Sequence, residues 1–176
     1  MRLTIIPPTR TVLRAFLICF LILGTAGCRK APPEPTGLVA EKAMVVSARE
    51  EASRIGLEIL QKGGNAFDAM IATEMALTVA YPFAGSLGGG GFMVYRLADG
   101  TTGSIDYREK APLAATADMY LDSLGNPDPA KSRMGATAVG VPGAIAGIFE
   151  VHERFGTLPM DTLLAPAIEL ARKGVG

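Results

Sequence analysis

GSLGGGGFMVYRLADGTTGSIDYREKAP, residues 85–112, is the stretch that decides the fold. Its four consecutive glycines lead into FMVYRL, and Asp99-Gly100 separates this apolar run from TTGSIDY. An Asp-Gly pair between two such runs is the strongest short-range signal for a β-hairpin. We therefore predict two antiparallel strands, one on each side of this pair. Because the first strand is apolar at nearly every position, we expect it to be covered on both faces.

Two helices are predicted before the hairpin. Ser47 with Glu50 three residues later fits a capping box, and Gly63 is placed to end this helix in a left-handed turn. Asn65 fits the N-cap of a second helix, residues 66–80, which is apolar nearly all round. A helix of that kind is buried on most of its sides.

Two further helices are predicted after the hairpin. Pro142 suits the first turn of a helix that Gly156 ends, and residues 158–173 have an amphipathic pattern of their own. Helices that pack on a well-buried antiparallel hairpin make a layered α+β arrangement. The sequence stops in mid-pattern, so we expect the chain to be a truncated part of a longer domain.

The N-terminus, residues 1–27, has the pattern of a secretory signal peptide. Residues 1–14 carry three arginines and no acid, and residues 15–23 are an unbroken apolar run. Small residues directly before Cys28 resemble a bacterial lipoprotein cleavage box, in which this cysteine is lipidated and becomes the new N-terminus. Thr25 departs from that pattern, because an aliphatic residue is usual there. The alternatives are an ordinary cleaved signal and, last, an uncleaved membrane anchor, for which nine apolar residues are too few.

Residues 28–38 follow as a tether that contains three prolines. This composition favours a stiff, solvated linker between an anchor and a domain. The folded part is then expected over residues 39–176. Together these features predict an exported, periplasmic protein that is anchored to a membrane as a lipoprotein.

Charge and cysteine content exclude several classes of function. Without residues 1–27 the chain keeps 14 basic and 17 acidic residues, a net charge of about −3, which does not favour a nucleic-acid partner. Cys28 is then the only cysteine, and His152 is the only histidine. An internal disulfide is therefore impossible, and a metal site made of histidine and cysteine is not expected. No cofactor is implied.

The glycine run, residues 88–91, is the first candidate for a site, because glycines let backbone amides approach a ligand or another chain closely. It precedes a strand and no Lys-Ser/Thr pair follows it, which argues against a nucleotide phosphate loop. Two interpretations stay open: a tight bend between packed backbones, or the wall of a site. His152 is interpreted as an exposed helix residue rather than a catalyst.

Asp106, Arg108 and Glu109 place an arginine between two acids at the end of the second strand. The planar arginine fork binds a carboxylate through two parallel hydrogen bonds, and a flanking acid either holds that fork or receives an ammonium group. A site with both functions would recognise the head group of an α-amino acid. An exposed ion-pair cluster, worth under about 1 kcal/mol, explains the same residues, and composition alone favours that simpler interpretation.

Several short motifs carry more information than composition does. In chain order they are GGNAFDA (63–69), GSLGGGGFM (85–93), DYREKAP (106–112), GVPGAIAG (140–147), FGTLPM (155–160) and PAIELARKG (166–174). From about Val39 to the end, the chain resembles the N-terminal part of the large subunit of the γ-glutamyltranspeptidase (glutathione hydrolase) family. Any one motif is weak evidence, whereas several unusual motifs in a fixed order are a strong signal.

The resemblance implies an N-terminal-nucleophile hydrolase with an αββα sandwich. Members of the family cleave themselves into a large and a small subunit, and the nucleophile is the threonine that starts the small subunit. It forms an acyl-enzyme with the γ-glutamyl group of a small-molecule substrate such as glutathione, then passes that group to water or to an amine. This chain would hold no catalytic residue, would need its own small subunit as partner, and would be inactive alone.

Two residues of the family motif D-[FY]-R-E-x-A-P map onto this chain. Arg108 matches the arginine that binds the α-carboxylate of the γ-glutamyl group, and Glu109 matches an acid that supports the substrate-binding site. One alternative is a cephalosporin or glutaryl acylase, which shares the scaffold. Another is a non-catalytic, lipid-anchored protein that binds amino acids. The retained Arg108 favours γ-glutamyl substrates.

Overall fold

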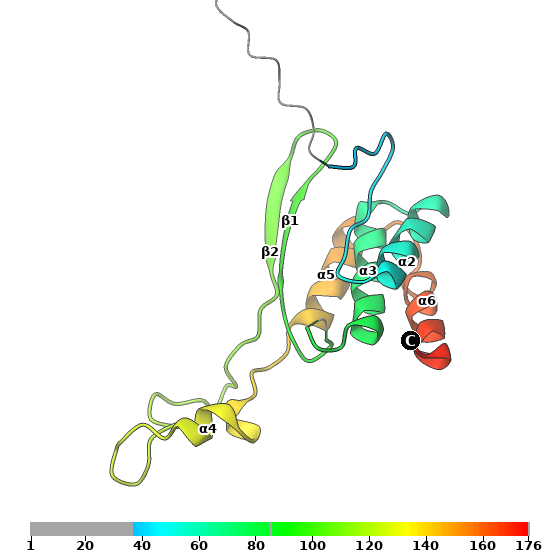
Figure 1. The fold of residues 1–176 in the computed structure, drawn as a ribbon. Coiled ribbons are helices and arrows are strands. Elements are labelled where there is room, and N and C mark those ends of the chain that lie inside the picture. The colour runs from blue at the N-terminus through cyan, green and yellow to red at the C-terminus, as the bar shows by residue number, and fades with distance from the viewer. Residues whose placement is uncertain (1–36, 85, 176) are drawn as a thin grey trace, which may run out of the picture. The chain divides into compact units, whose positions relative to one another are not determined.

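Two helices precede a single hairpin and further helices follow it in the computed structural model, which describes residues 37–84 and 86–175 (Figure 1). The elements, in order, are α2 (Glu50–Gln61), α3 (Ala66–Ala80), β1 (Phe92–Arg96), β2 (Thr102–Asp106), α4 (Pro129–Arg133), the 3-10 turn η1 (Ala136–Ala138), α5 (Ala144–Phe155) and α6 (Met160–Lys173). The signal peptide, the lipidation of Cys28 and most of the tether lie outside the described residues and stay predictions. None of the helices described is long and apolar enough to cross a membrane.

The predicted hairpin is confirmed. Strands β1 and β2 pair antiparallel, with a register that runs from Phe92 opposite Asp106 to Arg96 opposite Thr102. The turn between them depends on Gly100, whose φ of +90° lies in the left-handed region that favours glycine. Its N–H donates to the carbonyl of the residue that follows β1, at 3.0 Å, and so closes the turn.

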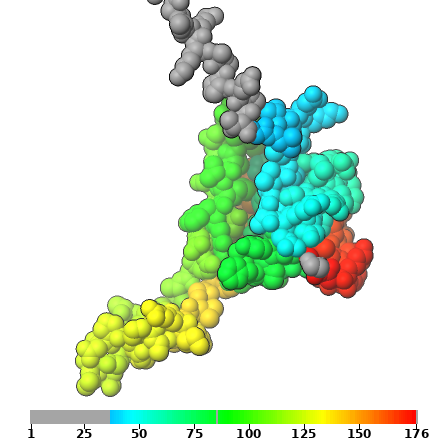
Figure 2. All heavy atoms as spheres, viewed as in Figure 1, coloured from blue at the N-terminus to red at the C-terminus, as the bar shows by residue number. Residues whose placement is uncertain are grey.

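The two faces of the hairpin differ in burial. Met93 on the inner face is 9% exposed, whereas Phe92 and Val94 on the outer face are 67% and 84% exposed. The expectation that the first strand is covered on both faces is therefore wrong for this chain. Side chains alternate along a strand, and the helices of the described residues pack on only one of its two faces. The hairpin atoms, green in Figure 2, accordingly lie at the surface.

Helix α3 lies at the centre of the helical layer and contacts α2, α5 and α6. Its buried side chains are mostly alanines, which allow the neighbouring helices to approach closely. The largest apolar side chains with no exposure come one each from α2, α3, α5 and α6: Ile59, Ile71, Val151 and Leu163. The prediction that residues 66–80 form a helix buried on most sides is confirmed. The inner face of the hairpin packs against the core that these helices form.

Three aromatic rings join the hairpin to the helices. Phe67 of α3 stacks on Phe155 of α5 with ring centroids 4.4 Å apart. Tyr95 of β1 contacts both rings, at 6.0 Å from Phe67 and 4.9 Å from Phe155. Such aromatic pairs contribute on the order of 0.5–1.5 kcal/mol beyond their buried area. The inner face of β1 is thereby fixed to the helical layer, and the predicted α+β arrangement of helices on an antiparallel hairpin is confirmed.

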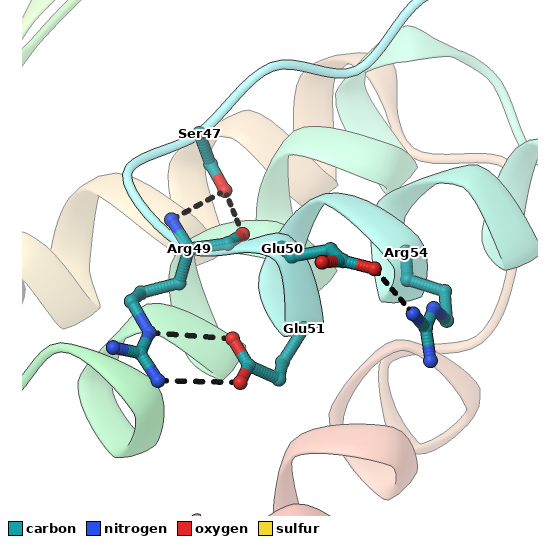
Figure 3. A network of polar contacts seen from close by, with 5 residues as sticks. All are labelled: Ser47, Arg49, Glu50, Glu51 and Arg54. Atoms are coloured by element: carbon teal, nitrogen blue, oxygen red, sulfur yellow. Dashed lines mark hydrogen bonds and ion pairs between the residues drawn. The ribbon is translucent and has the colours of Figure 1, made fainter.

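The predicted capping box of the first helix is wrong. Helix α2 begins at Glu50 and its N-cap is Arg49, which makes no side-chain cap. The Ser47 hydroxyl donates to the carbonyl of Arg49 at 2.8 Å, and Glu50 pairs with Arg54 at 2.5 Å (Figure 3). The serine hydroxyl is thus engaged in a local turn before the helix. Helix α5 also starts later than predicted, at Ala144 rather than at Pro142.

Candidate functional site

The candidate site lies where strand β2 ends. The Arg108 backbone N–H donates to Asp106 Oδ1 at 3.0 Å, so the aspartate closes a tight turn that redirects the chain. The Nε of Arg108 lies 3.2 Å from Glu109 Oε2. Its guanidinium carbon lies 5.7 Å from the centroid of the Phe92 ring. The structure therefore brings together Asp106, Arg108 and Glu109, as the sequence indicates, and adds Phe92, which sequence reasoning missed.

The guanidinium of Arg108 keeps hydrogen-bonding capacity. The side chain is 55% exposed, and Glu109 meets it at Nε. Among residues 37–84 and 86–175, neither terminal nitrogen, Nη1 or Nη2, makes a hydrogen bond, and the ion pair with Glu109 is made at Nε. These two nitrogens form the end of the fork and donate in parallel to one carboxylate. The contact with Glu109 thus leaves the bidentate end of Arg108 available to a ligand.

A hollow of about 440 Å³ lies beside this arginine, between the end of β2 and the start of α5. Its charged lining consists of Asp106, Arg108, Lys110 and Glu150. Glu150 is also paired with Arg154, at 3.4 Å. A hollow that offers an arginine fork and separate carboxylates can receive a small molecule that carries both a carboxylate and an ammonium group.

Two glycine segments hold the residues that lead into Arg108. The N–H of Gly91 donates to the carbonyl of Tyr107 at 3.3 Å and its carbonyl accepts from the N–H of Tyr107 at 3.0 Å, which extends the β ladder. A Cβ at Gly90 would lie 2.6 Å from the Tyr107 carbonyl oxygen. Side chains at Gly143 and Gly147 would also collide with Tyr107. The glycine run therefore acts here as a close packing surface that positions the backbone beside Arg108.

The same run also fixes the start of α5. The carbonyl of Gly89 accepts hydrogen bonds from the N–H groups of Gly143 and Ala144, both at 3.0 Å. Two N–H groups at the start of this helix are thereby satisfied by the loop before β1. Of the two interpretations that the sequence left open for the glycines, the structure supports the packing role.

Tyr107 lies near an acidic side chain of α3. Its ring packs against the core, and the carboxyl of Glu74 on α3 lies near its hydroxyl. Burial raises the pKa of Glu74, and the nearby Tyr107 hydroxyl only partly opposes this shift. Burial, with the nearby charge of Glu74, raises the pKa of Tyr107. Sequence reasoning missed this pair, although an acid in the apolar stretch 66–80 was a usable signal.

The motif GGNAFDA makes a structural junction at the other end of α3. The Asn65 side chain caps the helix and donates from Nδ2 to the Phe155 carbonyl at 2.6 Å. Asp68 is fully buried and accepts from the N–H of Asn65 at 2.9 Å and of Thr157 at 3.0 Å. Burial by itself raises the pKa of Asp68, but these hydrogen bonds and that of the Thr157 hydroxyl lower it overall. The predicted Asn65 cap is confirmed.

His152 has a structural contact. One of its ring nitrogens, Nε2, lies 2.8 Å from the carbonyl oxygen of Leu158, across the turn between α5 and α6. The side chain is half-buried rather than exposed as expected. Within the part of the chain that the structure describes, no group of three or more histidine, cysteine or acidic side chains could hold a metal ion.

The chain resembles known proteins in family, sequence and structure. The family model described as gamma-glutamyltranspeptidase matches residues 52–176. The glutathione hydrolase proenzyme of Pseudomonas sp. (strain A14) is 48% identical over 165 residues, which are 94% of this chain and 28% of that protein. The glutathione hydrolase proenzyme of Escherichia coli (strain K12) is 43% identical over 176 residues, covering 93% of this chain and 30% of that protein.

The chain is also similar to a solved structure and to a relative with a different name. The Helicobacter pylori gamma-glutamyltranspeptidase superposes with a TM-score of 0.75 at 44% identity, over 79% of this chain and 40% of that chain. The acylase ACY 1 proenzyme of Pseudomonas sp. (strain V22) is 46% identical over 153 residues, 84% of this chain and 26% of that protein. The chain spans less than a third of the length of these curated relatives.

Proposed function

Because this chain belongs to the gamma-glutamyltranspeptidase family, we propose that it supplies the α-carboxylate clamp of an enzyme that hydrolyses or transfers γ-glutamyl groups. The proposed substrates are glutathione and related γ-glutamyl compounds. The observation that carries the proposal is the end of Arg108, whose Nη1 and Nη2 make no hydrogen bond to the described residues while Glu109 lies beside Nε. A carboxylate bound there would gain two charge-assisted hydrogen bonds.

The chemistry is proposed to occur on a threonine outside this chain. After self-cleavage of a precursor, the threonine at the start of the small subunit attacks the γ-glutamyl carbonyl and releases the amine as the first product. The free α-amino group of that threonine takes up the hydroxyl proton and passes it to the departing amine. Water or an acceptor amine then attacks the resulting ester. The residues of this chain contribute by holding the α-carboxylate, so that the γ-carbonyl reaches the nucleophile in one orientation.

Glu109 has a supporting role in this proposal. Its Oε2 is buried and lies 3.2 Å from Nε of Arg108 as an ion pair, and it has no hydrogen-bond partner among the described residues. The carboxylate therefore fixes one edge of the guanidinium and leaves the other edge for the substrate. Its negative charge also partly neutralises the arginine before substrate binds, which would limit the capture of unrelated anions.

An acylase activity is the second candidate, favoured by the similarity to the acylase ACY 1 proenzyme. A glutaryl group has the same carbon chain as a γ-glutamyl group but carries no α-amino group. The hollow beside Arg108 offers carboxylates that suit an ammonium group, so the γ-glutamyl substrate is the better match. Parallel assays with a γ-glutamyl anilide and a glutaryl anilide separate the two activities.

The proposed activity is tested with the protein expressed from its complete reading frame. We expect self-cleavage into two subunits and release of the chromophore from γ-glutamyl-p-nitroanilide. Arg108→Lys should lose most of the activity through a raised KM, because an ammonium group cannot reproduce the fork. Arg96→Lys, an exposed arginine in the same hairpin, is the matched control. A folded, uncleaved protein without chromophore release would contradict the proposal, and would favour a non-catalytic binding protein.

The membrane location is a separate proposal. Cys28, which follows the predicted signal peptide, would carry the lipid and retain the protein at the periplasmic side of a membrane. Labelling of cells with an alkyne-bearing fatty acid should mark the wild-type protein, and Cys28→Ala should lose both the label and the membrane fraction. An unlabelled wild-type protein in the soluble periplasmic fraction would indicate an ordinary cleaved signal.

A further inference from the structure

Phe92 is an exposed aromatic residue in an unusual place. It is the first residue of β1, its ring is on the outer face of the hairpin, and it is 67% exposed. It does not belong to the core cluster that holds the inner face of the hairpin. Its position opposite Asp106 in the strand register brings it next to the turn that leads to Arg108.

The contact with Arg108 follows from this register. The Asp106 side chain accepts from the Arg108 N–H, and the turn that it closes brings the guanidinium back over the ring at 5.7 Å from its centroid. An arginine at this distance is within the range of a cation–π interaction. The ring meets the guanidinium while Glu109 meets its Nε edge, so both contacts leave the Nη1 and Nη2 end accessible.

We propose that Phe92 is a positioning residue for the carboxylate clamp, with its ring as the platform on which Arg108 is held in its binding orientation. This inference rests on the proposed function. An unsupported arginine side chain has many rotamers, and a substrate must restrict them when it binds. A ring that already restricts them reduces this entropic penalty. The ring also shields the guanidinium from water, which strengthens its hydrogen bonds to a carboxylate.

The test is a set of variants of the mature enzyme, assayed with γ-glutamyl-p-nitroanilide. Phe92→Leu keeps an apolar side chain but removes the ring, so KM should rise about two- to five-fold while kcat stays within two-fold. Phe92→Tyr keeps the ring and should retain the wild-type KM. Val94→Leu, on the same exposed face, is the matched control and should also retain it.

Two measurements distinguish a structural role of Phe92 from a positioning role. A residue that acts only on Arg108 can be changed without loss of stability, so Phe92→Leu should keep the wild-type melting temperature and the wild-type rate of self-cleavage. In an Arg108→Ala background the same substitution should leave KM unchanged, because the ring acts only through the arginine. An equal rise of KM in both backgrounds would overturn the inference.

The outcomes also distinguish this inference from the proposed function. A wild-type protein that releases no chromophore contradicts the proposed function. An active wild type with an unchanged KM in Phe92→Leu contradicts only the role of the ring. If Phe92→Leu does not mature, Phe92→Tyr and Phe92→Trp decide: a KM raised in both ring-bearing variants overturns the inference, and a wild-type or lower KM supports it.

Discussion

Asp68 and Arg108 are both charged residues of short motifs, yet they lie in opposite surroundings. Asp68 is fully buried and receives hydrogen bonds from two segments far apart in the sequence. Arg108 is half exposed, and the contacts of its side chain leave the end of its fork accessible. A buried charge with satisfied hydrogen-bonding capacity contributes to stability, whereas a supported charge with remaining capacity can bind a ligand. The two residues therefore differ in how much hydrogen-bonding capacity their neighbours in the fold leave available to a ligand.

The largest effect is expected from Asp68→Asn, which tests whether Asp68 acts on stability rather than on substrate binding. The amide nitrogen would face N–H donors, and the charge that the buried site stabilises would be lost. We expect a loss of about 3 kcal/mol in the free energy of unfolding. Thermal or urea denaturation of the protein measures this loss, with the exposed Asp161→Asn as control. KM of the folded fraction should stay near wild type; a stable Asp68→Asn protein with a raised KM would reverse the roles assigned to the two residues.

A substitution in the glycine run, residues 88–91, should change both stability and substrate binding. A Cβ at Gly90 would meet the backbone of Tyr107 and Arg108 at 2.6–2.8 Å, so one of the two chains must move. Gly90→Ala should cost about 2 kcal/mol of stability and raise KM, because the displaced backbone carries Arg108. At Gly88 the nearest atom to such a Cβ is a serine oxygen at 3.7 Å, which makes Gly88→Ala the matched control. Equal effects of the two variants would contradict the packing role of the glycine run.

The contact between Glu109 and Arg108 should have a smaller effect. Glu109→Gln keeps the size of the side chain but removes the charge that lies beside Nε, so we expect KM to rise roughly two- to five-fold. Stability should be nearly unchanged, because both side chains are partly exposed. Steady-state kinetics and a melting curve on the same sample measure both quantities. A melting temperature that falls while KM is unchanged would move Glu109 from the site to the structural framework.

The sequence predicts those features that depend on neighbouring residues. Asp99-Gly100 is sufficient for the hairpin, and Asn65 is sufficient for the start of α3. The position of Arg108 beside Glu109 also follows from their order in the chain. Local rules failed at Ser47, because its hydroxyl bonds the backbone of Arg49 within the turn before α2. A side chain with two local partners within reach leaves a capping motif ambiguous.

Long-range contacts were beyond sequence reasoning for a different reason. Asp68 meets Thr157 across 89 positions, and no pattern near either residue indicates the other. The close packing around Tyr107 likewise requires Gly143 and Gly147, which lie just before α5 and within it. The stacking of Arg108 on Phe92 depends on the strand register together with the Asp106 turn. The motifs thus identify which residues matter, while their physical roles depend on packing between distant segments.

The smallest expected effect compares Asp68 with Glu74, two acids on one helix. The lowered pKa of Asp68 means that its charged form stabilises the fold, so its contribution is present above about pH 4 and is lost as pH falls through the folded-state pKa. The raised pKa of Glu74 has the opposite sign: stability is lost as pH rises from the unfolded-state pKa to the raised folded-state pKa. Glu74→Gln should therefore raise the melting temperature slightly at pH 7, where Asp68→Asn lowers it. Its advantage should vanish below about pH 4, where wild-type Glu74 is protonated in both states. Melting curves of the three proteins from pH 3 to pH 8 measure these differences, and a Glu74→Gln effect that does not change with pH would show that packing against Tyr107, rather than charge, is what the substitution alters.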